Sequence, residues 1–388
     1  MKRFILVVAA GAALCACQPP ANGASPQATP EASASSSKAS TAMQVESIAG
    51  GLEHPWAVAP LPDGGFLVTE RAGRLRRIAA DGTLSAPLAG VPKVFAQGQG
   101  GLLDVVLAPD FATSKRIYFS YAEPGDGDTA GTATAYATLG DKAITDVRVF
   151  YRQQPKLEGG NHFGSRIAFD RAGHVYITQG DRFSYRMYAQ QLDKLQGKLV
   201  RLNLDGSVPR DNPFAGRKDA RPEIWSYGHR NMQGLAIDPR TGKLWESEHG
   251  PRGGDEINLP QPGANYGWPL VTYGIDYSGV KYPETIGTSA PGMEQPHHYW
   301  AKSPGISGLA FYTGHPESPW NDSLFVGSLA ESNLIRLTLR GDEIVGKERL
   351  LTDLGARIRD VRVGADGKVY VLTDADDGKL LRLTPPSK

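Results

Sequence analysis

The stretch that decides the fold is GLAIDPRTGKLWESEHG, residues 234–250. It contains a short apolar segment, a turn built from Asp, Pro and Gly, and a second apolar segment. Short apolar runs on either side of such a turn are typical of a two-stranded antiparallel hairpin. We therefore expect residues 234–250 to form a β-hairpin, and the fold depends on how often this unit recurs.

The same pattern recurs loosely from residue 44 onward, giving six copies. They span residues 57–70, 104–122, 166–181, 234–250, 308–328 and 360–374. The segment QVESIAG at 44–50 is expected to complete the last unit. Six sheet-like units in one chain predict an all-β fold, a six-bladed β-propeller. A pair of β-sandwiches is the alternative, but sandwiches do not require the same hairpin six times.

The beginning of the chain differs in composition from the rest. Residues 1–17 predict a lipoprotein signal peptide, because a basic start and a short apolar run lead into LCAC (14–17), the pattern of a bacterial lipobox. An ordinary signal peptide cut nearby is the alternative. Residues 18–43, rich in Ala, Ser, Pro and Gln, predict a disordered tether. Residues 44–388 are then the propeller domain.

This beginning also predicts where the protein works. Lipid on Cys17 would anchor it in the bacterial periplasm, at the outer membrane, and the anchor would be its only contact with a membrane. The formal net charge is +1 and there is no basic run, so nothing predicts binding to nucleic acid.

The repeat places many polar residues at one mouth of the ring. In an antiparallel hairpin the start of the first strand and the end of the second lie at the same end. Residues at these points of different copies should therefore meet, and they are Gln99, Asn161, His162, Asp181, Arg230, Asn231, Gly250, Pro251, Arg357, Arg359 and Asp374. Arginines facing one channel repel each other unless an anion lies between them, which favours an acidic ligand.

Two chemical interpretations follow from this set. His162 with Asp181 at the same face suits a general base, because a carboxylate can orient a neutral imidazole. A solvated histidine in a glycine-rich loop is the alternative. The Gly/Pro loop with Gly250, Pro251 and Glu256 combines free carbonyls with carboxylates, which suits calcium, although it could also be purely structural.

Six motifs together resemble the soluble PQQ-dependent glucose dehydrogenase and aldose sugar dehydrogenase family. They are GQGGLLDVVLAPDF (98–111), NHFGSRIAFD (161–170), YGHRNMQGLA (227–236), SEHGPRGGDEIN (247–258), NYGWP (265–269) and ARIRDV (356–361). The resemblance implies a six-bladed propeller that binds pyrroloquinoline quinone (PQQ) and Ca²⁺. It also implies oxidation of an aldose sugar at C1 to the lactone, by histidine-assisted hydride transfer to the quinone; the electron acceptor is left open.

The resemblance assigns roles to individual residues. It implies that His162 is the base, that Asp181 orients it, and that Arg230 stabilises charge on the quinone. The implied cofactor contacts are Gln99, Asn161, Arg230, Asn231, Arg357 and Arg359, with Trp300 stacked on the cofactor and Asp374 added from its place at the mouth. The implied calcium ligands are the carbonyls of Gly250 and Pro251, with a second site at Glu256 and the Tyr266 backbone.

Two departures from the family pattern concern cofactor binding. Asn161 stands where some members have Asp, and Ala330 stands where the family commonly has a lysine. The second departure predicts weaker binding of the anionic cofactor. Two other functions remain open: a calcium-dependent sugar-lactone hydrolase, which needs several carboxylates at a central metal, and a non-catalytic propeller that only binds partners.

Overall fold

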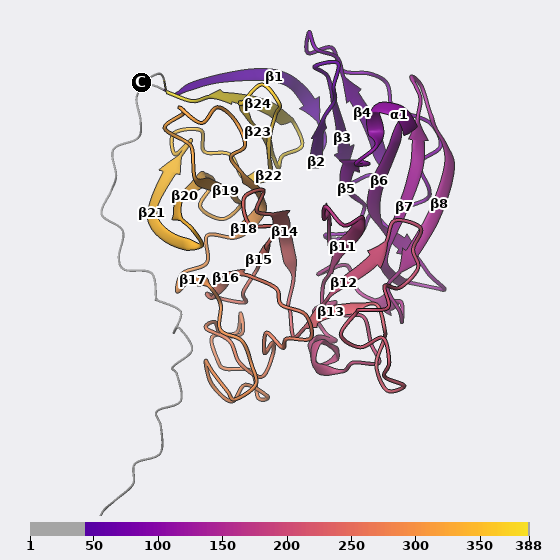
Figure 1. Ribbon diagram of the computed structural model, residues 1–388, viewed down its shortest axis with the longest axis vertical. Helices are drawn as coiled ribbons and strands as arrows, with labels where there is room; N and C mark the ends of the chain where they lie inside the picture. Colours follow the sequence, from indigo (N-terminus) through magenta and orange to yellow (C-terminus); the bar gives the residue numbers. More distant parts are fainter. Residues whose placement is uncertain (1–42, 387–388) are drawn as a thin grey trace, which may run out of the picture.

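The computed structural model describes residues 43–386 and consists almost entirely of β-strands in six sheets. The sheets follow one another around a ring in chain order, from blade one in indigo to blade six in yellow (Figure 1). The prediction of a six-bladed β-propeller is confirmed. The predicted signal peptide and almost all of the predicted tether lie outside the described residues, among which no helix has the length and apolarity needed to cross a bilayer.

Each predicted hairpin forms the two inner strands of one blade. Blade one has β2 (Pro55–Pro60), β3 (Phe66–Glu70) and β4 (Arg74–Ile78). Blade two has β5 (Leu102–Leu107), β6 (Arg116–Pro124), β7 (Thr129–Leu139) and β8 (Ile144–Arg152), and the short β9 (Leu157–Glu158) pairs with β7. Blade three has β10 (Gly164–Phe169), β11 (His174–Gln179), β12 (Lys198–Asn203) and β13 (Ile224–Tyr227).

The second half of the ring repeats this order. Blade four has β14 (Met232–Ile237), β15 (Leu244–Glu248), β16 (Asp255–Asn258) and β17 (His298–Trp300). Blade five has β18 (Ile306–Phe311), β19 (Ser323–Ser328), β20 (Leu334–Arg340) and β21 (Glu343–Leu350). Blade six has β22 (Ile358–Val363), β23 (Val369–Thr373), β24 (Gly378–Thr384) and β1 (Gln44–Leu52). Two short helices, α1 (Phe111–Ser114) and the 3-10 helix η1 (Arg186–Gln190), lie in connections.

The ring is closed by strands from the two ends of the described chain. β1 runs antiparallel to β24, with Gln44 opposite Thr384 and Glu46 opposite Arg382. The expectation that residues 44–50 complete the last blade is therefore confirmed. In the closed ring every blade packs against a blade on each side. The innermost strands accordingly contact one another in succession around the channel, in the order β2, β5, β10, β14, β18, β22 and back to β2.

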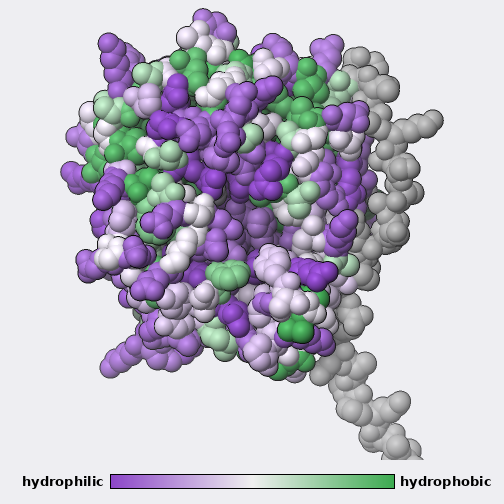
Figure 2. All heavy atoms as spheres, turned by 180° about the vertical axis from the view of Figure 1, so that it is seen from behind, coloured by the Kyte–Doolittle hydropathy of each residue, from purple (hydrophilic) through white to green (hydrophobic). Residues whose placement is uncertain are grey.

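The hydrophobic core lies between neighbouring blades. One cluster packs Trp56 and Leu67 of blade one against Val105 and Phe119 of blade two, and similar clusters fill the other junctions. Each strand alternates its side chains between two faces that neighbouring blades cover, which is why consecutive residues of the inner strands are buried. On one face of the ring hydrophilic side chains gather around the middle, and hydrophobic ones are scattered near the edge (Figure 2).

Candidate functional site

The site begins with a histidine and an aspartate at one end of the blade-three hairpin. His162 precedes β10 and Asp181 follows β11, and His162 Nδ1 lies 2.6 Å from Asp181 Oδ1. The strand ends approach closely because glycines occupy the crossing: a side chain at Gly180 would collide with the carbonyl of His162, and Gly164 adopts φ 62°. The pairing expected from the sequence is therefore present.

Asp181 is held by more than the imidazole. The backbone N–H of Phe183 donates to Asp181 Oδ1 at 2.7 Å, and Trp268 Nε1 donates to Oδ2 at 2.7 Å. His162 is fixed from its other side, because its backbone N–H donates to Gln99 Oε1 at 3.0 Å. Both partners of the pair are buried, His162 at 5% and Asp181 at 0% exposure. The imidazole orientation is thus set before any ligand binds.

The electrostatics favour a neutral imidazole. Burial lowers the pKa of His162 below its ordinary value, Asp181 opposes this, and the charges of Arg230 and Arg182 lower the pKa further. A neutral ring that donates from Nδ1 to Asp181 leaves Nε2 as an acceptor. None of the described residues hydrogen-bonds to Nε2. His162 therefore has the state and the orientation of a general base.

Arg230 ties this pair to the blade-four loop. Its Nη1 donates to the carbonyls of His249 at 2.9 Å and Gly250 at 2.7 Å, and its backbone N–H donates to Glu248 Oε2 at 2.9 Å. Its guanidinium lies 5.2 Å from the centre of the Trp268 ring, a cation–π distance. With these contacts Arg230 is a rigid, buried positive charge close to His162.

Asn231 lies one residue further on and carries an unused donor. Its Oδ1 accepts from Gly164 N at 3.2 Å and from Gln233 Nε2 at 3.2 Å. Its Nδ2 is buried without a hydrogen-bond partner among the described residues. A buried unpaired donor is unfavourable by about 1–3 kcal/mol, so a ligand oxygen at this point would be stabilising. Asn161 contributes its backbone carbonyl, which accepts from Arg182 Nε at 3.1 Å.

Blade six contributes the second cationic group. Arg359 Nη2 donates to Asp374 Oδ2 at 2.8 Å and its Nη1 donates to Gln233 Oε1 at 3.2 Å. The half-exposed Arg357 reaches the same Asp374 oxygen at 3.3 Å, and His54 Nδ1 lies 3.0 Å from the other oxygen. Burial alone would raise the pKa of Asp374, but Arg359 and its neighbours hold it below the usual range. Part of the arginine charge is therefore already balanced within the protein.

Two adjoining cavities open among these residues. The first has a volume of ≈330 Å³ and the second ≈910 Å³, and both are lined by His249, Leu329 and Arg357. Gln99, Gly164, Arg71, Arg359 and Asp374 line the first; Gly250, Pro251, Asp255, Lys302 and Ala330 line the second. Their linings carry more guanidinium and ammonium groups than carboxylates, which suits an anionic ligand.

The loop after β15 only partly matches the predicted calcium ligands. Gly250 and Pro251 line the larger cavity, as the sequence led us to expect. The Gly250 carbonyl already accepts from Arg230, so a cation would share this oxygen, which has a second lone pair. Asp255 is engaged in structure, because it accepts from the backbone N–H groups of Gly250, Gly305 and Ile306.

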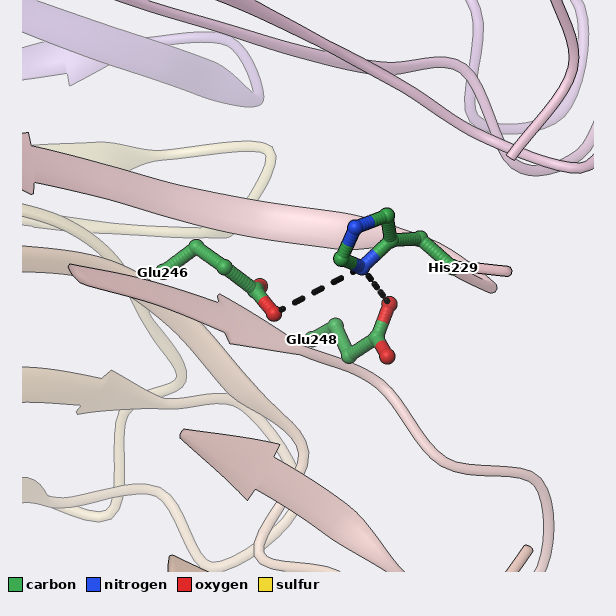
Figure 3. Close-up of side chains that lie close together, drawn as sticks. All are labelled: His229, Glu246 and Glu248. Atoms are coloured by element: carbon green, nitrogen blue, oxygen red, sulfur yellow. Dashed lines mark ion pairs between the residues drawn. The ribbon is translucent and has the colours of Figure 1, made fainter. Parts of the chain in front are cut away.

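A second group of acids lies behind this loop, between β15 and β16. Glu248 stands opposite Glu256 and Glu246 opposite Asn258, so all four share one face of the sheet. Asn258 Nδ2 donates to Glu246 Oε1 at 2.8 Å and to Glu256 Oε2 at 3.2 Å. His229 Nδ1 points between Glu246 and Glu248, at 3.8 and 3.7 Å, and has no hydrogen-bond partner within residues 43–386 (Figure 3).

This acidic cluster has the character of a cation site. Burial, and then the charge of Glu248, raise the pKa of Glu246 and Glu256 well above the ordinary value. Glu246 Oε2 has no hydrogen-bond partner among the described residues. The Tyr266 ring stacks on His229 with the ring centres 4.7 Å apart, and Glu256 and Tyr266, the predicted second calcium site, line one small cavity together with Glu248. The sequence reasoning named Glu256 and Tyr266 but missed His229, Glu246 and Glu248.

Trp300 is the predicted site residue that the structure places elsewhere. It ends β17, the outer strand of blade four, and its side chain is fully buried in the core cluster with Trp245 and Leu309. It lines neither cavity. The expectation that Trp300 stacks on a cofactor is therefore wrong, because an outer-strand side chain lies away from the channel.

Three residues that the sequence reasoning did not select belong to the site. Trp268 contacts Asp181 and Arg230, Gln233 contacts Asn231 and Arg359, and His249 lines both cavities. Burial, with Arg359 and Arg230 nearby, lowers the pKa of His249 to about 3, so its imidazole is neutral. The available signal was their position: each lies within a few residues of a selected one.

Comparisons with known proteins agree with the geometry. The family described as Glucose / Sorbosone dehydrogenase matches residues 52–382. Aldose sugar dehydrogenase YliI of Escherichia coli (strain K12) is 54% identical over 346 residues, which cover 88% of this chain and 93% of that protein. A crystal structure of the soluble E. coli aldose sugar dehydrogenase in the apo-form matches with TM-score 0.86 at 54% identity, covering 88% of this chain and 99% of that one.

A more distant solved structure is informative about ligands. The PQQ-bound form of aldose sugar dehydrogenase from Streptomyces coelicolor matches with TM-score 0.72 at 27% identity, covering 90% of this chain and 100% of that one. The family match spans all six blades and includes every residue of the pair, the cationic cavities and the acidic cluster. The chain therefore belongs to the glucose / sorbosone dehydrogenase family.

Proposed function

We propose that this protein is an aldose sugar dehydrogenase that uses PQQ and Ca²⁺ to oxidise its sugar at C1. The observation that carries the proposal is the buried His162–Asp181 pair, with its free Nε2, beside a cavity rich in arginine. The relatives named above add support, since one is described as PQQ-bound. When bound, PQQ supplies the two-electron acceptor that takes the C1 hydride, so that the sugar leaves as the lactone.

The residues present fit such a cofactor. Arg357 and Arg359 line the smaller cavity and offer charge to carboxylates. Asn231 lines neither cavity, but its side chain bonds to Gln233, which lines the smaller one, and its Nδ2 has no hydrogen-bond partner among the described residues. Arg230 would stabilise negative charge that develops on a carbonyl oxygen near it. Gln99 lines the smaller cavity and also holds the His162 backbone, so it links the base to the bound ligand.

His162 is the residue that moves the proton. Its Nε2 accepts the proton of the C1 hydroxyl, while Nδ1 keeps its hydrogen bond to Asp181. The imidazolium formed in this step is stabilised by the Asp181 carboxylate, which also prevents the ring from turning. The burial of both groups excludes water from this transfer.

Calcium is proposed at two places. The carbonyls of Gly250 and Pro251 line the larger cavity, where a cation would act as a Lewis acid toward a quinone oxygen. The Glu256 and Tyr266 site is supported by the surrounding acidic cluster, whose carboxylates pair with no Lys or Arg side chain among the described residues. After chelation and dialysis, Ca²⁺ should restore PQQ binding better than Mg²⁺, because irregular oxygen-rich sites suit the larger ion. Full binding and activity in a verified metal-free protein would contradict this.

The central test is reconstitution. Purified apo-protein should gain dye-linked oxidation of an aldose on addition of PQQ and Ca²⁺, and His162→Ala should lose about 10²–10⁴-fold in kcat with little change in PQQ affinity. The matched control is His174→Ala, since His174 pairs with Asp170 at 2.8 Å at the opposite end of the same hairpin. Near-normal turnover by His162→Ala would remove the mechanism.

The hydrolase alternative has less support. It requires several carboxylates that converge on a central metal, whereas Asp374 and Asp255 are the acids lining the two cavities and both are engaged. The cheap discriminating observation is the product: lactone formed with reduction of a dye, or acid formed from an added lactone. A purely binding role is tested by the same reconstitution.

We also propose that the mature protein is a periplasmic lipoprotein anchored at Cys17 to the outer membrane. The support is the lipobox pattern at residues 14–17. Metabolic labelling with a fatty acid should label the wild type and leave Cys17→Ser unlabelled. Native protein with a different, unmodified N-terminus would overturn the assignment.

A further inference from the structure

One tryptophan connects the two halves of the candidate active site. Trp268 lies in the loop between β16 and β17 and is 4% exposed. Its Nε1 donates to Asp181 Oδ2 at 2.7 Å, and the face of its ring lies 5.2 Å from the Arg230 guanidinium. A single side chain of blade four thus contacts the residue that orients the base and the residue that supplies positive charge.

We propose that Trp268 is a positioning residue for the oxidation, which it serves by holding the Asp181 carboxylate against His162 and by supporting Arg230. The inference rests on the proposed role of His162 as base. It concerns a residue that touches neither cavity, so its action is exerted through its neighbours.

The hydrogen-bond pattern of Asp181 explains why one N–H matters. Oδ1 accepts from both His162 Nδ1 and Phe183 N, whereas Oδ2 accepts from Trp268 alone among the described residues. Without that donor Oδ2 is unpaired and the rotation of the carboxylate about its Cβ–Cγ bond is restrained at Oδ1 alone, so the imidazole keeps its partner in a less fixed orientation. The indole thus completes the satisfaction of a fully buried charge.

Trp268 is itself well anchored. Its backbone N–H donates to the Gly228 carbonyl at 2.8 Å, and its ring packs edge-on against Tyr282 at 5.3 Å and against Ala189. The 3-10 helix of blade three contributes Ala189, so the indole is clamped between loops of blades three and four. The position of the N–H is therefore set by packing, as a positioning residue requires.

Loss of the indole N–H has a defined electrostatic consequence. The groups that act on His162 are Asp181, Arg230, Arg182 and His249, and the ring edge of Phe183 lies 5.1 Å away. Of these only Asp181 favours the charged imidazolium. A carboxylate that has lost one donor attracts the imidazole proton more strongly, so the acid limb of the pH profile should move to higher pH.

The experiment compares Trp268→Phe with Trp245→Phe. Trp245 is a matched control, because it is fully buried in blade four and its Nε1 has no hydrogen-bond partner among the described residues. In Trp268→Phe we expect kcat to fall about tenfold. The midpoint of the acidic decline of kcat/KM should move to higher pH by about half a pH unit to one pH unit. The control should show neither change. An unmoved limb in Trp268→Phe overturns the proposal.

A second measurement needs no cofactor. In apo-protein with labelled histidine, the NMR resonance of the short His162 Nδ1–H···Asp181 bond should shift or vanish in Trp268→Phe and persist in Trp245→Phe; an unchanged resonance contradicts the proposal. Trp268→Gln, which keeps an N–H donor, should retain the wild-type midpoint of the acidic decline of kcat/KM. A midpoint displaced as far as that of Trp268→Phe would also overturn the proposal. Failure of the wild-type protein to oxidise sugar would instead contradict the proposed function. The NMR comparison would still test whether Trp268 holds the His162–Asp181 pair.

Discussion

Replacing Asp181 by asparagine removes a charge with almost no change in shape. In the wild type the carboxylate accepts three hydrogen bonds, from His162 Nδ1, Phe183 N and Trp268 Nε1. An amide has one acceptor and one donor end, so it cannot satisfy all three donors. Either its NH₂ group faces Trp268, which puts two donors against each other, or it faces His162 and forces the imidazole to accept at Nδ1.

The orientation in which the amide donates to His162 predicts a large loss of activity, and the other orientation predicts a loss of stability. If the amide donates to Nδ1, the imidazole carries its proton on Nε2 and cannot accept the hydroxyl proton, which removes a general base contribution of about 10²–10⁴-fold. If the NH₂ faces Trp268, a buried unsatisfied donor destabilises the fold by about 1–3 kcal/mol. We expect kcat to fall by about 10²–10⁴-fold, but no further than in His162→Ala, since Asp181 acts through that histidine.

The assay is dye-linked sugar oxidation by the reconstituted variant, together with a PQQ titration of its apo-form. Affinity for PQQ should be nearly unchanged, because Asp181 lines neither cavity. Asp170→Asn is the control, as Asp170 pairs with His174 at the far end of the hairpin. A kcat within about threefold of wild type would refute the role of Asp181 and the assigned imidazole tautomer.

Three further predictions concern pH, charge and ring closure. Burial lowers the pKa of His162 from 6.5, so the base stays neutral down to a lower pH than a free histidine would. The acidic decline of kcat/KM should therefore have its midpoint below pH 6.5, and a midpoint above pH 6.5 would contradict the buried neutral base. Ala330→Lys should tighten PQQ binding measured by titration of apo-protein at fixed Ca²⁺, by roughly tenfold for one charge-assisted hydrogen bond; equal or weaker binding would indicate that another cation of that cavity already acts there. Leu52→Ala should lower the free energy of unfolding by about 2–5 kcal/mol, since this β1 residue is fully buried, whereas Val45→Ala, at an exposed position near the other end of β1, should change it little. Equal effects of the two substitutions in urea titrations would argue against the closed ring.

The fold could be predicted because each blade repeats one local pattern. The turn residues and apolar runs of 234–250 produce β14 and β15, and the same reasoning holds for the other five hairpins. It also placed His162 beside Asp181, because their positions follow from hairpin geometry alone. Residues fixed by strand direction and turn position are therefore readable from sequence.

The parts of the site that depend on contacts between loops could not be predicted from the sequence. Trp268 reaches Asp181 from another blade, and no spacing in the sequence encodes that contact. Trp300 was misplaced because a motif alignment gives no depth within a blade, whereas the structure puts it on the outer strand. Glu246 and Glu248 lie two residues apart and therefore share one face of β15, but their meeting with His229 and Glu256 depends on contacts that the sequence does not show.

The pairing of β1 with β24 has a consequence for how the molecule assembles. During synthesis β1 is made early and its partner last, so β1 remains an unpaired edge strand for nearly the whole process. Long-range strand pairing is slow to form, and the ring should close in a late step that brings the chain ends together. Pulsed hydrogen exchange during refolding should therefore protect the amides of β1 after those of β10 and β11; early protection of β1 would rule this order out.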